Sequence, residues 1–93
     1  MISVQFHENV VSLCDSELIG KTFEEGKHFL VVSEIFYRGE EMNKKKVIEV
    51  LKNAISINLV GKKTIAIALE EGFIQKKDII HIQGVPHVQI YAF

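Results

Sequence analysis

The first fifteen residues alternate between apolar and polar positions. Val4 and Phe6 fall on one side of an extended strand, and Val11 and Leu13 take equivalent places after a polar turn. An alternation with a period of two on both sides of a short turn predicts a hairpin of two antiparallel strands. The same alternation points Cys14 away from the apolar side of the hairpin.

The middle of the chain carries a third apolar run and two helical patterns. Residues 29–32 are apolar and follow a turn at 24–26, which predicts a third strand. Residues 43–58 place apolar side chains three and four positions apart, and residues 62–71 do so again. These spacings predict two helices, with a break between them at Gly61.

Small polar residues and glycines mark the expected ends of these elements. Asn43 is placed to cap the first long helix, and Gly72 is placed to end the second. A short helical turn is expected from Ser33 to Gly39, and another over residues 15–20, since each combines a capping side chain with a closing glycine.

Two more alternating stretches, residues 78–83 and 88–93, end the chain around the sequence Gly-Val-Pro-His. Pro86 has no N–H group and Gly84 permits unusual backbone angles, so a turn or a kink at a sheet edge is expected there. The predicted fold is a single α+β domain over residues 1–93. Its mostly antiparallel sheet combines the N-terminal hairpin, the third strand and two C-terminal strands, and packs against two helices.

Composition and charge narrow the class of protein. The chain has 93 residues, 47% of them hydrophobic and 25% charged, which is enough for one apolar core. Its net charge of −1 gives no overall attraction to nucleic acid or anionic lipid. Cys14 is the single cysteine, no signal peptide is recognisable, and no apolar stretch approaches the roughly 20 residues of a membrane span. A cytoplasmic protein is expected.

Three short segments resemble one known family. They read CDSELIGKTFEEG at 14–26, NLVG at 58–61 and GVPHVQ at 84–89. Their order and spacing, over nearly the whole chain, are similar to those of the archaeal family known as domain of unknown function 424. Lys44–Lys46 depart from it, because relatives tend to carry acidic residues in that helical turn. The resemblance implies a cytoplasmic archaeal protein and no particular activity.

Cys14 is a candidate nucleophile. It precedes a helical turn whose dipole lowers a thiol pKa, and a base such as His87 could activate it. Asp15 is adjacent, and its negative charge disfavours the thiolate. A small enzyme built on Cys14, Asp15 and His87 would need these side chains within about 4–6 Å of one another. The alternative is a cysteine that only packs.

Metal binding has weak support in the pattern. His7, His28, His81 and His87 show no recognised ligand spacing, and the cysteine pairs of structural zinc sites are absent. We therefore expect neither a metal nor a cofactor.

The start of the second helix suits a phosphate-like anion. Asn58 and Gly61 precede it, Lys62 and Lys63 open it, and the first N–H groups of a helix attract negative charge. The pattern is not a P-loop, so the alternative is an ordinary helix junction with solvated lysines.

Lysines of the helical half could also follow a nucleic-acid backbone. A solvated helix face is the alternative, and Arg38, the single arginine, argues against base recognition by paired guanidinium contacts. The candidate lysines are Lys44, Lys45, Lys46 and Lys52.

The corner near the C-terminus has a possible functional role through Gly84, Pro86, His87 and Gln89. A histidine beside a rigid corner can titrate, donate or ligate. The simpler interpretation is a half-buried histidine that is hydrogen-bonded to a nearby carbonyl.

The sequence as a whole predicts a non-enzymatic binding or accessory module that contacts RNA or a ribonucleoprotein. The alternatives are the small enzyme described above, and a structural homodimer or complex subunit in which the C-terminal strand pairs with a second copy. The placement of residues 14–21, 58–63 and 84–89 separates these possibilities, because three distant segments gathered at one cleft would form a site.

Overall fold

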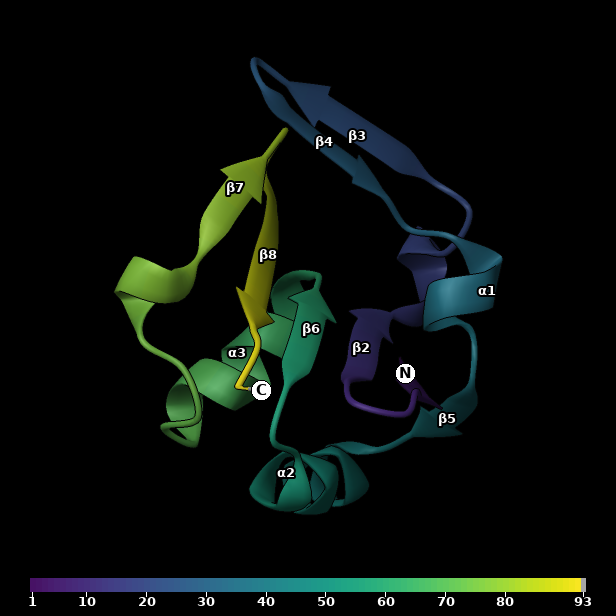
Figure 1. Ribbon diagram of the computed structural model, residues 1–93, viewed down its shortest axis with the longest axis vertical. Helices are drawn as coiled ribbons and strands as arrows, with labels where there is room; N and C mark the ends of the chain where they lie inside the picture. The colour runs from purple at the N-terminus through teal and green to yellow at the C-terminus, as the bar shows by residue number, and fades with distance from the viewer. Residues whose placement is uncertain (93) are drawn as a thin grey trace.

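The central sheet of the protein joins both ends of the chain (Figure 1). The computed structural model describes residues 1–92, and within this range six strands form one sheet in the order β5-β1-β2-β6-β8-β7. Neighbouring strands are antiparallel except for β2 and β6, which are parallel. The predicted α+β fold with a mostly antiparallel sheet is therefore confirmed. The strands are β1 (Ile2–Phe6), β2 (Val11–Asp15), β5 (Glu40–Met42), β6 (Ile57–Val60), β7 (Ile80–Ile82) and β8 (Val85–Ile90).

Two helices, α2 (Lys44–Asn53) and α3 (Lys62–Glu70), cover one face of this sheet. Alternate strand residues point toward them and form the larger apolar core, in which Leu13, Leu59 and Val88 lie against the helices. The hairpin predicted from the first fifteen residues is present as β1 and β2. The alternation of period two thus separates a helix-covered face from a second face of different chemistry.

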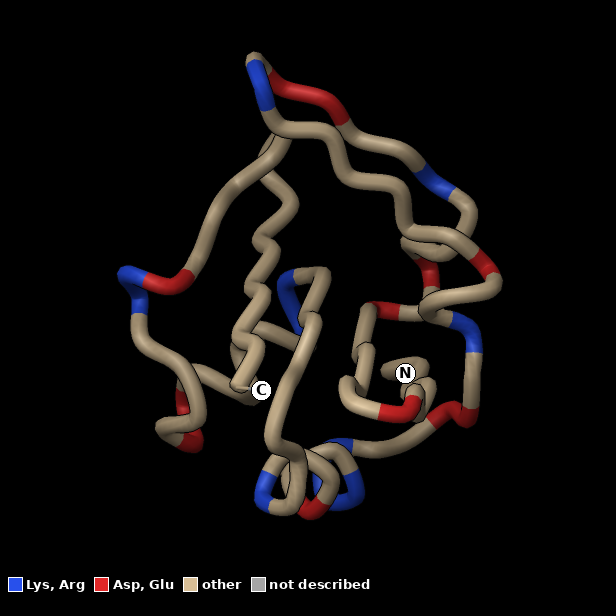
Figure 2. Tube along the Cα trace, viewed as in Figure 1, with Lys and Arg blue, Asp and Glu red and all other residues tan. Residues whose placement is uncertain are grey.

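The lysines of the helical half do not gather on one surface (Figure 2). Those of α2 lie on the helix-covered side of the molecule, and two of them pair with acidic groups. The Lys44 ammonium is 3.6 Å from the Glu70 carboxylate, and the Lys46 ammonium is 3.9 Å from that of Glu40. Such exposed pairs contribute little to stability.

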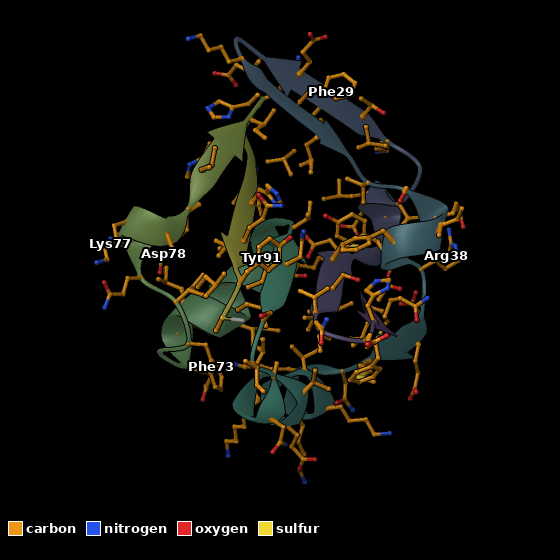
Figure 3. All side chains as sticks on the ribbon, in the orientation of Figure 1. Phe29, Arg38, Phe73, Lys77, Asp78 and Tyr91 are labelled. Carbon is orange, nitrogen blue, oxygen red and sulfur yellow. The ribbon has the colours of Figure 1, made fainter. Side chains whose placement is uncertain are left out.

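A hairpin of β3 (Thr22–Glu25) and β4 (His28–Val31) arches over the other face, followed by the one-turn helix α1 (Glu34–Tyr37). Phe29 of this hairpin is 64% exposed (Figure 3). The third strand that the sequence predicts exists as β4, but it pairs with β3 alone in a separate two-stranded sheet. Its inclusion in the central sheet was wrong. Two short 3₁₀ turns, η1 (Ser16–Leu18) and η2 (Lys76–Asp78), complete the structure.

Strand β6 replaces the end of the first predicted helix. Helix α2 ends at Asn53, and Ile57–Val60 form a central strand that is buried at all four positions. A strand that is buried on both faces shows no apolar alternation, so its pattern resembles the continuation of a helix. The prediction of a helix up to residue 58 was therefore wrong for its last turn.

The C-terminal corner is a hairpin turn. Gln83 and Gly84 both have positive φ, 51° and 78°, which suits the tight two-residue turn between β7 and β8. Pro86 lies inside β8 and not at an edge, contrary to expectation. It is tolerated because β6 pairs with β8 only from His87 onward, while the Pro86 carbonyl accepts the Gly61 N–H at 2.9 Å.

The last strand is an interior one. β8 lies between β6 and β7, but β7 pairs only with its first half, Val85–His87. The pairing of a second copy of the chain with the C-terminal strand therefore stays a prediction. Within residues 1–92, no helix is long and apolar enough to cross a lipid bilayer.

Candidate functional site

The three segments singled out in the sequence meet where β2 and β6 end and β8 begins. The Asp15 carboxylate accepts the N–H groups of Lys63 at 3.0 Å and Thr64 at 2.9 Å, and the Thr64 hydroxyl at 2.8 Å. Gly61, just before α3, donates its N–H to Pro86. We call this group of Asp15, Gly61, Thr64 and Pro86 the strand-end joint. It gives the sequence segments a structural role, since it fixes three strands and a helix to one another.

The joint fills the predicted anion site with a carboxylate of the protein itself. The first N–H groups of α3 are bonded to Asp15, and an external anion would have to displace it. Asn58 lies on the opposite face of the sheet, and the Lys63 ammonium lies 3.5 Å from Glu17. The prediction of an anion site at Asn58, Gly61, Lys62 and Lys63 was therefore wrong. A hollow of about 380 Å³ remains beside the joint, bordered by Leu18, Lys62 and residues 83–86.

The candidate catalytic residues do not converge. Cys14 is opposite Val60, and Val60 is opposite His87, so one whole strand separates the thiol from the imidazole. Two strand spacings put their backbones about 10 Å apart. Cys14 is fully buried, and this burial raises the pKa of its thiol to about 12. Asp15 faces the helices. The predicted grouping of Cys14, Asp15 and His87 was wrong.

A row of polar side chains crosses the face that the helices leave uncovered. Gln5 is opposite Ser12, Ser12 is opposite Asn58, and Asn58 is opposite Gln89, so four adjacent strands contribute one side chain each. Ser12 and Asn58 are buried. The sequence held a signal of this row that we missed: Asn58 is a single polar residue within an apolar run, where a polar side chain needs a partner.

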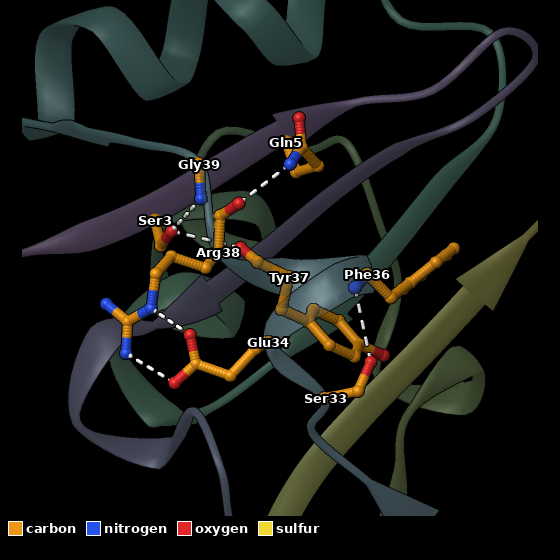
Figure 4. Close-up of polar contacts among 8 residues, drawn as sticks. All are labelled: Ser3, Gln5, Ser33, Glu34, Phe36, Tyr37, Arg38 and Gly39. Atoms are coloured by element: carbon orange, nitrogen blue, oxygen red, sulfur yellow. Dashed lines mark hydrogen bonds and ion pairs between the residues drawn. The ribbon is translucent and has the colours of Figure 1, made fainter.

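Helix α1 is bound to this polar face by side chains of β1 (Figure 4). The Ser3 hydroxyl donates to the Tyr37 carbonyl at 3.0 Å and accepts the Gly39 N–H at 2.8 Å. The Gln5 amide donates to the Arg38 carbonyl at 2.7 Å. These bonds hold the Tyr37 ring over the sheet, where it is buried.

His7 contributes to the same attachment. Its Nε2 donates to the Phe36 carbonyl at 2.9 Å, and its ring stacks on the Phe36 ring with centroids 4.4 Å apart. His7 is therefore a structural histidine that connects the β1–β2 turn to α1.

A groove of about 450 Å³ opens between the hairpin, α1 and strands β6, β7 and β8. Figure 3 shows two of its lining residues, Phe29 on the hairpin and Tyr91 just after β8. Among the described residues, those that line it include no Asp, Glu, Lys or Arg. The lining comprises His28, Phe29, Leu30, Val31, Ser33, Phe36, Tyr37, Asn58, Ile80, Ile82, His87, Gln89 and Tyr91.

His87 presents a neutral nitrogen acceptor to this groove. Its Nδ1 lies 2.9 Å from the Leu59 carbonyl, which can only accept, so Nδ1 carries the proton and Nε2 carries a lone pair. No group within residues 1–92 bonds to Nε2. Every fully buried side-chain nitrogen in this range has a hydrogen-bond partner, so Nε2 is not fully buried and is open to the groove. Burial lowers the pKa of His87 below 6.5, which keeps the ring neutral at pH 7. The predicted bond to a nearby carbonyl is present, and the histidine is buried where a half-buried one was expected.

The hydroxyls and amides beside His87 form a chain of hydrogen bonds. The Tyr37 hydroxyl donates to Asn58 Oδ1 at 2.7 Å, and Asn58 Nδ2 donates to the Tyr91 hydroxyl at 3.1 Å. Gln89 Nε2 donates to the same oxygen at 3.2 Å. Burial raises the pKa of Tyr37, so its phenol stays protonated. The Gln89 carbonyl oxygen accepts no bond from any described residue.

The lowered pKa of His87 makes the stability of the protein depend on pH. The unfolded histidine binds a proton more readily than the folded one, so the contribution of His87 is complete above pH 6.5. It is lost as the pH falls below 6.5 and through the lowered pKa. We expect urea unfolding at several pH values to show a smaller loss of stability on acidification for His87→Gln than for the wild-type chain. His81→Gln, a change at an exposed histidine, serves as the control. Equal losses in all three proteins would contradict the assignment.

No three His, Cys, Asp or Glu side chains within residues 1–92 are grouped so as to hold a metal ion. The candidate lysines Lys44, Lys45, Lys46 and Lys52 belong to α2, on the far side of the sheet from the groove. Their contact with a nucleic acid stays a prediction. Other lysines adjoin groove elements along the chain: Lys27 precedes His28, and Lys76 and Lys77 of η2 precede β7.

The fold and the groove define a small α+β protein with an open, uncharged polar site between a sheet and a hairpin. The chain belongs to the family described as protein of unknown function (DUF424), which it matches over residues 3–93. A solved structure, an uncharacterized conserved protein from Methanopyrus kandleri, is similar with a TM-score of 0.72 and 28% sequence identity. The similarity covers 97% of this chain and 88% of that chain. A comparison with curated proteins finds none that matches.

Proposed function

We propose that this protein is a non-enzymatic, cytoplasmic binding module whose ligand is single-stranded RNA, free or within a ribonucleoprotein, with one unpaired base held in the groove. The observation that carries the proposal is the lining of the groove: neutral acceptors and amides beside aromatic rings, without a charged side chain among the described lining residues. Proteins that recognise single-stranded RNA stack splayed bases on aromatic rings and bond to the base edges.

The size of the groove supports this ligand class. About 450 Å³ lies within the range of small-ligand sites and is enough for a planar base. Phe36 lines the groove beside the buried Tyr37, and the side chains of Phe29 and Tyr91, 64% and 47% exposed, offer aromatic surface at the rim. A charged ligand would find no counter-charge in this lining and would lose its hydration.

Lysines outside the groove support contact with the phosphates of the strand. Lys27 lies at the tip of the hairpin, and Lys76 and Lys77 lie in η2, so basic groups flank the elements that border the groove (Figure 2). Each phosphate contact on a single strand contributes about −0.7 to the slope of log K, where K is the binding constant, plotted against log salt concentration. Roughly three contacts therefore give a slope of about −2.

The separation of Cys14 from His87 favours binding over catalysis. A nucleophilic mechanism needs the base within hydrogen-bond reach of the nucleophile, and here strand β6 lies between them.

Fluorescence anisotropy with labelled single-stranded RNA of mixed sequence tests the proposal. We expect binding at low salt that weakens with a slope of about −2, and a slope of about −0.7 for Lys76→Ala/Lys77→Ala. The matched control Lys45→Ala/Lys52→Ala, on α2, is expected to bind like the wild-type chain. The absence of binding at low salt, or binding that salt does not affect, would overturn the proposal. If only the α2 control lost binding, the RNA would bind at the helices and not at the groove, and this result would also overturn the proposal.

A further inference from the structure

Two acceptor atoms on the β8 side of the groove receive no hydrogen bond from any described residue. His87 Nε2 carries a lone pair because Nδ1–H is bonded to Leu59. The Gln89 amide has its nitrogen bonded to Tyr91 and its carbonyl oxygen free of any described partner. Both atoms can accept hydrogen bonds from donors that a ligand brings to this wall.

The two acceptors lie on one side of the groove. His87 and Gln89 are two positions apart on β8, so both side chains project from the same face of the sheet at a spacing of about 6–7 Å along the strand. The Tyr37 hydroxyl donates to Asn58, and the Asn58 amide donates to Tyr91, so each of these donors makes a bond within the protein while the two acceptors stay open.

We infer that the groove selects a guanine, through donation from the guanine N1–H and N2 amino groups to His87 Nε2 and Gln89 Oε1. This inference rests on the proposed function and names the base that the RNA-binding site takes. Among the four bases, guanine alone carries two adjacent donors on one edge. Uracil offers one N–H between two carbonyls, and adenine and cytosine place a ring acceptor beside a single amino group, which would face the His87 lone pair.

The lining excludes the obvious competitors. A guanidinium or an ammonium group also supplies several N–H donors, but it brings a positive charge. The described lining residues include no carboxylate to neutralise that charge, so its desolvation would be uncompensated. An uncharged donor edge fits the same acceptors without this cost.

Labelled U-rich oligoribonucleotides that differ in one central nucleotide test the inference by anisotropy. We expect a central guanine to bind roughly tenfold tighter than a central uracil, as two net hydrogen bonds allow. Inosine, which keeps N1–H but lacks the amino group, is expected to fall between them. Gln89→Leu changes an exposed side chain, and we expect it to reduce the preference for guanine to less than about threefold. His87→Phe is expected to abolish the preference, whereas His81→Phe, on the opposite face, keeps it.

The outcomes separate the inference from the proposed function. Equal affinity for all central bases, with salt-dependent binding, would overturn the guanine inference and leave RNA binding intact. No binding of any oligomer would overturn the proposed function. If free guanosine competed at the same concentration as the oligomer, recognition of the guanine edge would be supported. The ligand would then be a free nucleoside and not an RNA strand, which would overturn RNA binding. A guanine preference that survives both Gln89→Leu and His87→Phe would overturn the assignment to these two residues.

Discussion

Replacing Gly61 by alanine is expected to lower the free energy of unfolding by about 3–5 kcal/mol. Gly61 has φ +111°, which strains any L-residue with a side chain. An added Cβ would also lie 2.3 Å from Asp15 Cγ and would displace the carboxylate from α3. In a domain of this size the loss corresponds to a fall in Tm of roughly 15–30 °C, measurable by circular dichroism.

A matched glycine isolates the contribution of the collision. Gly20 also has positive φ, +93°, but an added Cβ there meets nothing within 4 Å. Gly20→Ala should therefore cost only the backbone strain, about 1–2 kcal/mol. If the two variants lose the same stability, the contact between Gly61 and Asp15 contributes nothing and our account of the joint is wrong.

Replacing Asp15 by alanine is the second large change, with an expected loss of about 3 kcal/mol. The substitution leaves the part-buried Lys63 N–H, the buried Thr64 N–H and the Thr64 hydroxyl without their acceptor. It also removes a negative charge from the N-terminus of α3, where that charge is stabilising. Urea unfolding at pH 7 measures the effect, and Asp15→Asn, which keeps one acceptor oxygen, is expected to lose less.

An exposed carboxylate provides the control for this substitution. Asp78 accepts the Gln75 N–H at 2.8 Å at the start of η2 and lies at the surface, so Asp78→Ala should cost under about 1 kcal/mol. In the double variant Gly61→Ala/Asp15→Ala the Cβ no longer meets a carboxylate. The stability loss of the double variant should therefore be about 2 kcal/mol smaller than the sum of the losses of the two single variants. A loss equal to that sum would argue against the contact.

Local rules predicted the local elements of this fold. Asn43 caps α2 through the Lys46 N–H at 3.0 Å, and Ser33 caps α1 through the Phe36 N–H at 3.2 Å. Gly72 ends α3 with φ +79°, as expected of a glycine at that position. In each case the signal lies within a few residues of the structure it specifies, which makes it readable from the sequence.

The groove could not be predicted in the same way, because its wall is built from strands that are distant along the chain. Asn58 and Gln89 are neighbours only through the register of β6 and β8, and the sequence assigned Asn58 to a helix. Tyr37 reaches them through the attachment of α1 to β1. The sequence drew attention to His87, but its open nitrogen follows from a bond to Leu59 that no local pattern reveals.

The parallel contact between β2 and β6 determines how this chain can assemble. Residues 16–56 separate the two strands, so their pairing closes a long loop, whereas the hairpins on either side form from near neighbours. The pairing of β2 with β6, which joins the two halves of the sheet, should therefore limit the rate of refolding. During synthesis the groove cannot exist until the last strand has left the ribosome, so an unfinished chain is unable to capture its ligand.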